Sequence, residues 1–181
     1  MGIDPKNVNL LRVLGEMEAA GDLTLETIPP SWEFERDPIC VGELVTVATH
    51  YFDEEEEGKN TRPAHNALLL EIKRHNGTRA GVFAPTHLQN QILKIADIPA
   101  GVLDAEEDLR EDSALVGKLE ALRGRKVAIV YAGAEQSRNH SGGRVHIFQL
   151  ATLGEKADPK AVYDKLAQAL GLTGGNSRAG L

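Results

Sequence analysis

Residues 66–83 read NALLLEIKRHNGTRAGVF, and this stretch decides the fold class. From Leu68 to Ile72, every second residue places an apolar side chain on one face, which is the spacing of a half-buried β-strand. The dipeptide Asn76-Gly77 follows, and Asn-Gly between two strand-like runs is the strongest short signal for a β-hairpin. The stretch therefore predicts two antiparallel strands, joined by a tight turn, within a mainly β domain.

The rest of the chain supplies three more strands and several helices. β-branched and alternating residues predict strands over 39–52, 127–131 and 145–150. Apolar residues at helical spacing predict helices that begin near Val8, Pro85, Ser113 and Asp158. The order along the body of the chain is therefore strand, long loop, strand, hairpin, strand, helical connection, strand, loop and strand.

This order of elements is that of an OB-fold, a partly open five-stranded barrel that binds oligonucleotides across its second and third strands. We therefore expect a mainly β protein with helices. An OB-like five-stranded barrel would carry a helical connection between strands 3 and 4, with flanking N- and C-terminal helices. Four parts are expected: an N-terminal helical or extended extension (1–36), the OB-like barrel domain (37–153), a C-terminal helix (154–171) and a flexible tail (172–181).

The composition is that of one folded domain, with 181 residues of which 41% are hydrophobic and 26% charged. No apolar run approaches the roughly 20 residues needed to cross a bilayer, and residues 1–11 lack the pattern of a signal peptide. The single cysteine, Cys40, fits a reducing compartment and is expected to be a small buried residue in a strand. We therefore expect a cytoplasmic protein with no membrane partner.

Acidic residues give the chain its net charge of -7, and most of them lie in two stretches. Residues 53–57 are consecutive acids, and residues 104–112 hold six acids against one arginine. Both stretches are predicted loops, so the net charge says little about the barrel itself. Acidic loops also suit a basic protein partner, and a protein-interaction or assembly module is therefore the alternative function.

The sequence contains none of the common motifs for catalysis, nucleotide binding or metal binding. A Walker loop, a dinucleotide-binding glycine motif, a nucleophile elbow and a zinc-protease helix are all absent, and the histidines do not have the spacing of a zinc site. We therefore expect a protein that is not an enzyme and that uses no cofactor and no metal.

Single-stranded nucleic acid needs cations that follow its phosphates and flat side chains on which its bases stack. Residues 123–150 supply five Lys or Arg residues against one acid, although the whole protein is acidic. The candidate binding residues lie at the hairpin, at the last two strands and in the loop between them: Lys73, Arg74, Arg79, Phe83, Arg125, Lys126, Arg138, His140, Arg144, His146 and Phe148. Of the aromatic residues, Phe83 and Phe148 are expected to face outward.

Residues 83–150 resemble the second half of OB-fold single-stranded DNA-binding proteins of the phage and plasmid type. The resemblance rests on the helix start FAPTHL (83–88), the strand LRGRKVAIVYAG (122–133) and the closing strand GGRVHIFQL (142–150). It implies largely sequence-independent binding of single-stranded DNA, with RNA as the other ligand to consider, in replication, recombination or repair. Replication or recombination proteins would be the partners, and the terminal helices would either cap the barrel or pair subunits into a homo-oligomer.

Overall fold

The computed structural model describes residues 31–57, 60–137 and 143–172. The predicted N-terminal helix near Val8 lies outside these ranges, as does the predicted tail (172–181) apart from Leu172. In chain order the elements are β1 (Ile39–Phe52), β2 (Glu55–Glu57), β3 (Asn60–Arg62), β4 (His65–Arg74), β5 (Arg79–Phe83), α2 (Thr86–Ile95), the 3-10 turn η1 (Val102–Asp104), α3 (Ser113–Glu120), β6 (Lys126–Gln136), β7 (Arg144–Thr152) and α4 (Pro159–Ala169).

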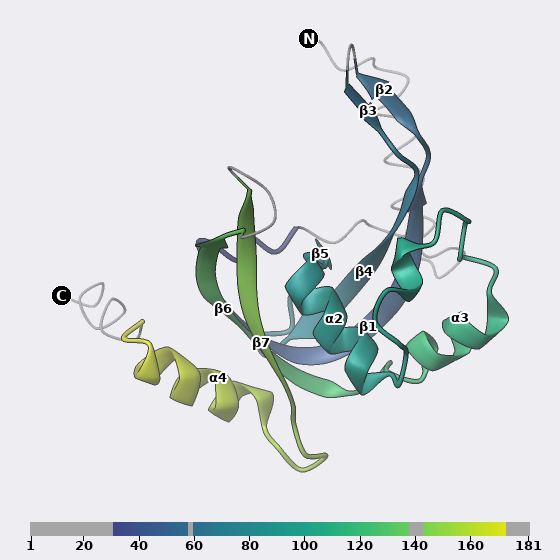
Figure 1. Ribbon diagram of the computed structural model, residues 1–181. Coiled ribbons are helices and arrows are strands. Elements are labelled where there is room, and N and C mark those ends of the chain that lie inside the picture. Colours follow the sequence, from purple (N-terminus) through teal and green to yellow (C-terminus); the bar gives the residue numbers. More distant parts are fainter. Residues whose placement is uncertain (1–30, 58–59, 138–142, 173–181) are drawn as a thin grey trace, which may run out of the picture.

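Five of the strands form one antiparallel sheet in the order β5-β4-β1-β6-β7. The expected mainly β class with helices is therefore confirmed. The strands are not closed into a barrel, because β5 and β7 are the two edges of the sheet and do not pair with each other. The short strands β2 and β3 pair separately as a hairpin that projects from the body of the molecule (Figure 1).

The predicted hairpin between β4 and β5 is present, with its turn at Asn76 and Gly77. Gly77 has a φ of 84°, a conformation that favours glycine because it has no Cβ. The side-chain oxygen of Asn76 accepts a hydrogen bond from the N–H of Thr78 (3.1 Å). The two turn residues therefore fix the register in which β5 returns along β4.

The main hydrophobic core lies between the inner face of the sheet and helices α2 and α3. Strands β1, β4 and β5 contribute every second side chain, among them the fully buried Leu44 and Leu70. Leu88, Ile92 and Leu93 of α2 belong to the same buried cluster, because apolar residues three or four apart lie on one side of a helix. Figure 1 shows α2 lying over the sheet, with α3 further along the chain beside it.

Residues 31–38 cross the open side of the sheet between β5 and β6. The N–H of Trp32 donates to the carbonyl of Gly81 on β5 (2.8 Å), and the carbonyl of Pro38 accepts from the N–H of Tyr131 on β6 (2.7 Å). The Trp32 side chain is buried and belongs to the same core as the sheet. This segment therefore covers core residues that an open sheet would leave exposed.

Helix α2 covers the free edge of β7 with two polar side chains. The amide group of Gln91 donates to the carbonyl of Phe148 (2.8 Å) and accepts from the N–H of Leu150 (2.8 Å). His87 Nδ1 accepts from the N–H of Phe148 (3.1 Å). These side chains replace a neighbouring strand, so the backbone groups at this edge are hydrogen-bonded although β7 has no second partner strand there.

A β-bulge at Val45 decides which side chains of β1 face outward. The pairing of β1 with β4 skips one residue between Leu44 and Thr46. One extra residue reverses the alternation of side chains along a strand, so everything after the bulge exchanges faces. His50 and Phe52 therefore lie on the outer face, opposite the main core.

Helix α4 covers only one part of that outer face. Ile39 and Val41 near the start of β1 pack with Ala128 of β6 against Ala167 of α4. The helix begins as the Asp-Pro pair predicts, because the Asp158 side chain accepts from a backbone N–H of the first turn. Over β4, β5 and the end of β1, no helix in the described ranges packs on the outer face.

Cys40 is fully buried on the inner side of β1, as expected from the sequence. Burial raises the pKa of its thiol to about 12, although the nearby Arg74 guanidinium partly opposes this shift. The thiol is therefore protonated at neutral pH and acts as a small apolar group in the core.

Candidate nucleic-acid interface

Two of the predicted binding cations make internal contacts instead. Arg74 forms an ion pair with Asp37 and donates to the carbonyl of Ile39 (3.0 Å), and its side chain is only 14% exposed. Lys126 Nζ donates to two carbonyls of the connection between β7 and α4 (2.8 and 3.1 Å). Both side chains hold segments of the fold together, so neither is free to follow a phosphate backbone.

Three other predicted cations lie at the surface. Lys73 of β4 and Arg79 of β5 are opposite each other in the hairpin, and Arg79 also forms an ion pair with Glu71. Arg125 is exposed in the turn before β6. Lys73 and Arg79 therefore place two exposed cations at one end of the outer face, where Glu71 pairs with Arg79 and Glu43 of β1 lies opposite Lys73.

The predicted loop cations Arg138 and His140 lie outside the described residues. Arg144 is exposed at the first position of β7. His146 is half-buried on the same strand, and its Nδ1 lies 3.0 Å from the hydroxyl oxygen of Tyr131. The start of β7 thus carries one exposed cation and one imidazole that is already hydrogen-bonded.

Phe148 is buried, with 1% of its surface exposed, so the prediction that it faces outward is wrong. Its ring packs against the rings of Phe34 (5.0 Å between centroids), Tyr131 (5.3 Å) and Trp32 (6.1 Å). Two of these rings come from residues 31–38, which cross the open side of the sheet. The alternation of residues along β7 gave no sign of that cover.

The outer face carries a cluster of four rings, His50, Phe52, His65 and Phe83, which we call the ring platform. The centroid of the Phe52 ring lies 4.5 Å from His50, 5.1 Å from His65 and 5.4 Å from Phe83. Phe52 and His65 are stacked with 20° between their planes. The Phe83 side chain is 49% exposed, which is high for a ring of this size.

Strand register places these rings next to one another. Phe52 lies opposite His65 in the pairing of β1 with β4, and Phe83 lies opposite Leu69 in the pairing of β4 with β5. Between these two rows, His50 faces the small residue Ala67. Strand pairing of this kind brings the side chains of neighbouring strands into contact, which is why the four rings form one cluster.

Only Phe83 of the ring platform was a predicted site residue. The rings on β1 were missed because the alternation of Val47, Thr49 and Tyr51 separates His50 and Phe52 from the inner face but does not show whether another segment covers the outer one. The alternation of β4 did indicate that His65 faces outward. Leu68, Leu70 and Ile72 mark the inner face of this strand, and His65 has the opposite parity.

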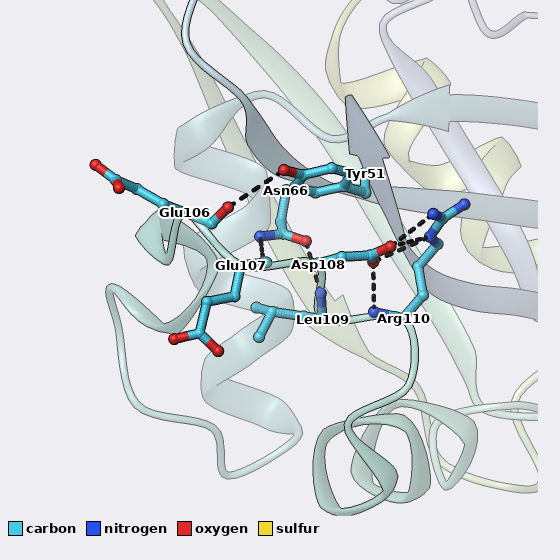
Figure 2. A network of polar contacts seen from close by, with 7 residues as sticks. All are labelled: Tyr51, Asn66, Glu106, Glu107, Asp108, Leu109 and Arg110. Carbon is cyan, nitrogen blue, oxygen red and sulfur yellow. Dashed lines mark hydrogen bonds and ion pairs between the residues drawn. The ribbon is translucent and has the colours of Figure 1, made fainter. Parts of the chain in front are cut away.

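The acidic stretch after η1 is held at the same end of the sheet, on the inner side (Figure 2). Asn66, 6% exposed, donates from its side-chain nitrogen to the carbonyls of Ala105 (2.9 Å) and Glu107 (2.7 Å). Its side-chain oxygen accepts from the N–H of Leu109 (3.1 Å), and the Tyr51 hydroxyl donates to the carbonyl of Glu106 (3.3 Å). This loop is therefore fixed to the sheet, although its carboxylates point to solvent.

Within that loop, Arg110 is the one basic residue, and it pairs with Asp108. Its guanidinium donates to both carboxylate oxygens (2.6 to 3.0 Å) and lies 6.0 Å from the centre of the Tyr51 ring. The hydrogen bonds from Arg110 lower the pKa of the Asp108 carboxyl. The remaining acids of the stretch therefore lie on the inner side of the sheet, whereas the ring platform, Lys73 and Arg79 lie on the outer face.

In the described ranges, no three side chains of His, Cys, Asp or Glu lie close enough together to hold a metal ion, and this includes the ring-platform histidines His50 and His65. In the same ranges, no helix is both long and apolar enough to span a membrane.

Comparison of the chain with protein-family models, with curated proteins and with solved structures finds no match. The site must therefore be interpreted from its own chemistry.

Proposed function

We propose that this chain is a non-enzymatic, cytoplasmic protein that binds single-stranded DNA across the ring platform. The observation that carries the proposal is the half-exposed Phe83 within four adjacent rings, on a face of β4 and β5 that no described helix covers. Exposed aromatic rings in a row are costly in water unless a ligand or partner covers them. Nucleic-acid bases are flat and apolar on their faces, so they suit such a surface.

The order of the sheet supports the same proposal. We propose that β1, β4, β5, β6 and β7 correspond to the five strands of an OB-like barrel that is open between the third and the fifth. In an OB-fold the second and third strands carry the oligonucleotide, and here these strands are β4 and β5, which hold Phe83 and His65. The connections between β1 and β4 and between β6 and β7 would flank the bound strand.

Binding of this kind depends on stacking and on phosphate contacts more than on base-edge hydrogen bonds. Each stacked base contributes about 1–3 kcal/mol, and every base offers a π face. Lys73 and Arg79 lie on the outer face at one end of the platform, where they would meet phosphates. We therefore expect largely sequence-independent binding, as replication, recombination or repair require.

Fluorescence anisotropy of a labelled oligothymidine of about 30 nucleotides tests the proposal, with a duplex of equal length for comparison. The single strand should bind, and Phe83→Leu should weaken its binding at least fivefold because one stacking surface is lost. Phe83→Tyr should retain most of the affinity because it keeps the ring.

Leu170→Ala is the matched control, because Leu170 at the end of α4 is 50% exposed, as Phe83 is 49% exposed. This variant should bind the oligothymidine like the unchanged protein. Equal affinity of Phe83→Leu and the unchanged protein, or equal binding of duplex and single strand, would contradict the proposal.

The fixed acidic loop favours one alternative function, a module that docks a basic protein partner. The Asn66 contacts hold the backbone of residues 105–109 in one conformation, which reduces the entropy cost of presenting the acids to a partner. Under this alternative, replacing Glu106, Glu107 and Glu111 by Gln would abolish a stable protein complex and leave oligothymidine binding unchanged. Under our proposal, the same substitutions should tighten oligothymidine binding slightly, because they lower the overall negative charge of the protein and leave the platform unchanged.

A further inference from the structure

A hollow of about 490 Å³ lies between the start of α2 and the start of β7. Thr86, His87 and Asn90 line it from the helix, and Arg144 and His146 line it from the strand. All of these side chains carry a hydrogen-bond donor or an imidazole, and none of the described residues that line the hollow is a carboxylate. The lining therefore suits an anion.

His87 offers a donor of known position. Its Nδ1 accepts from the backbone N–H of Phe148 (3.1 Å) and lies 3.1 Å from Nε2 of Gln91. Because two N–H groups approach Nδ1, this nitrogen carries no proton, and the neutral ring must carry its proton on Nε2. This N–H of His87 has no hydrogen-bond partner among the described residues, so it is available to a ligand in the hollow.

Arg144 supplies the positive charge. It is exposed, and it forms no ion pair with any residue in the described part of the chain. The Glu35 carboxylate lies 4.0 Å from Nδ1 of His146, which also faces the Tyr131 hydroxyl, and Glu135 of β6 pairs with Val145 and not with Arg144. The guanidinium of Arg144 is therefore free to bind a phosphate, whose oxygens match its fork of N–H groups.

The hollow begins where the ring platform ends along the chain, because Pro85 lines the hollow and Phe83 is only two residues before it. We propose that the hollow is a subsite for one phosphodiester of the strand whose bases stack on the ring platform. This inference rests on the proposed function. It adds the path of the bound nucleic acid, which would run from β4 across the end of β5 towards β7.

The salt dependence of binding tests the subsite apart from the platform. For a single strand, the slope of log K against log salt falls by about 0.7 for each phosphate contact that is lost. Arg144→Gln should lower the slope by about 0.7 and weaken oligothymidine binding severalfold at low salt. Phe83→Leu should weaken binding without changing the slope, because stacking releases no counterion.

Lys94→Gln is the matched control, since Lys94 is an exposed cation in the last turn of the same helix. Asn90→Asp is a second test, because it places a carboxylate at the hollow and should weaken binding more than Asn90→Ala. The subsite is overturned if Arg144→Gln and Asn90→Asp bind like the unchanged protein while Phe83→Leu binds more weakly. If the unchanged protein binds no oligothymidine at low salt, the proposed function and the subsite both fail.

Discussion

Asn66 is the one buried polar or charged residue in the described ranges, and it uses its whole amide group. Its two donors and its acceptor meet three backbone groups of the acidic loop, at Ala105, Glu107 and Leu109. A buried amide is costly without partners, so these hydrogen bonds are needed both by the side chain and by the loop. One residue thus joins β4 to a segment about 40 positions further along the chain.

We predict that Asn66→Ala lowers the free energy of unfolding by about 3 kcal/mol. The substitution leaves two carbonyls and one N–H near the core without their partner, at about 1–3 kcal/mol for each fully buried group. Urea unfolding followed by Trp32 fluorescence measures this change. Asn66→Asp should be no more stable, because a carboxylate repels the two carbonyls.

Asn90→Ala is the control for this change, because Asn90 is exposed on α2 and makes no hydrogen bond within the described residues. Its unfolding free energy should stay within about 0.5 kcal/mol of the unchanged protein. A similarly small effect for Asn66→Ala would show that the loop is not held through this side chain.

At the scale of elements, the contact between α2 and β7 replaces a missing strand pair. We predict that Gln91→Met, which keeps the side-chain volume, destabilises the protein by about 2 kcal/mol, because the carbonyl of Phe148 and the N–H of Leu150 lose their partner. Hydrogen exchange of the Leu150 amide should become faster by the corresponding factor.

Gln89→Met is the matched control, because Gln89 lies on the same helix and its side chain makes no hydrogen bond within the described residues. Exchange of the Leu150 amide should not change in this variant. If Gln91→Met and Gln89→Met have the same effect, α2 does not protect the edge of β7 through Gln91.

The elements that the sequence predicts best are those with local causes. The turn at Asn76-Gly77, the start of α4 at Asp158 and the buried Cys40 all follow from residues within a few positions, and the structure has each of them. The bulge at Val45 has no such local cause. It arises from the pairing of β1 with β4, and the extra residue keeps both Leu44 before it and Val47 after it on the inner face. Alternation separates His50 and Phe52 from Thr49 and Tyr51, but it does not predict that the described helices leave their face uncovered.

The difference between local and distant causes also explains which residues of the candidate site were predicted correctly. Phe83 was predicted to face outward and does, because β5 is an edge strand and no described helix covers its outer side. Phe148 was predicted to face outward and is buried, because its cover comes from Trp32 and Phe34, more than 100 positions away. Exposure on a strand depends on such distant segments, which alternation alone does not specify.

For the whole molecule, the open sheet divides its surface by charge and by shape. The acidic loop held by Asn66 lies on the inner side of the sheet, whereas the ring platform, Lys73 and Arg79 lie on the outer face. A negatively charged strand should therefore bind along the outer face and leave the platform past Phe83, despite the net charge of -7.

Zero-length photo-cross-linking of an oligothymidine that carries 4-thiothymine, followed by tryptic peptide mapping, tests this central claim most directly. Cleavage after Arg79 and Lys94 gives one peptide, residues 80–94, that holds Phe83 and the helical side of the hollow. The account predicts that this peptide carries the main cross-links and that Phe83→Leu reduces them. Cross-links confined to other peptides, such as those of α4, would contradict it.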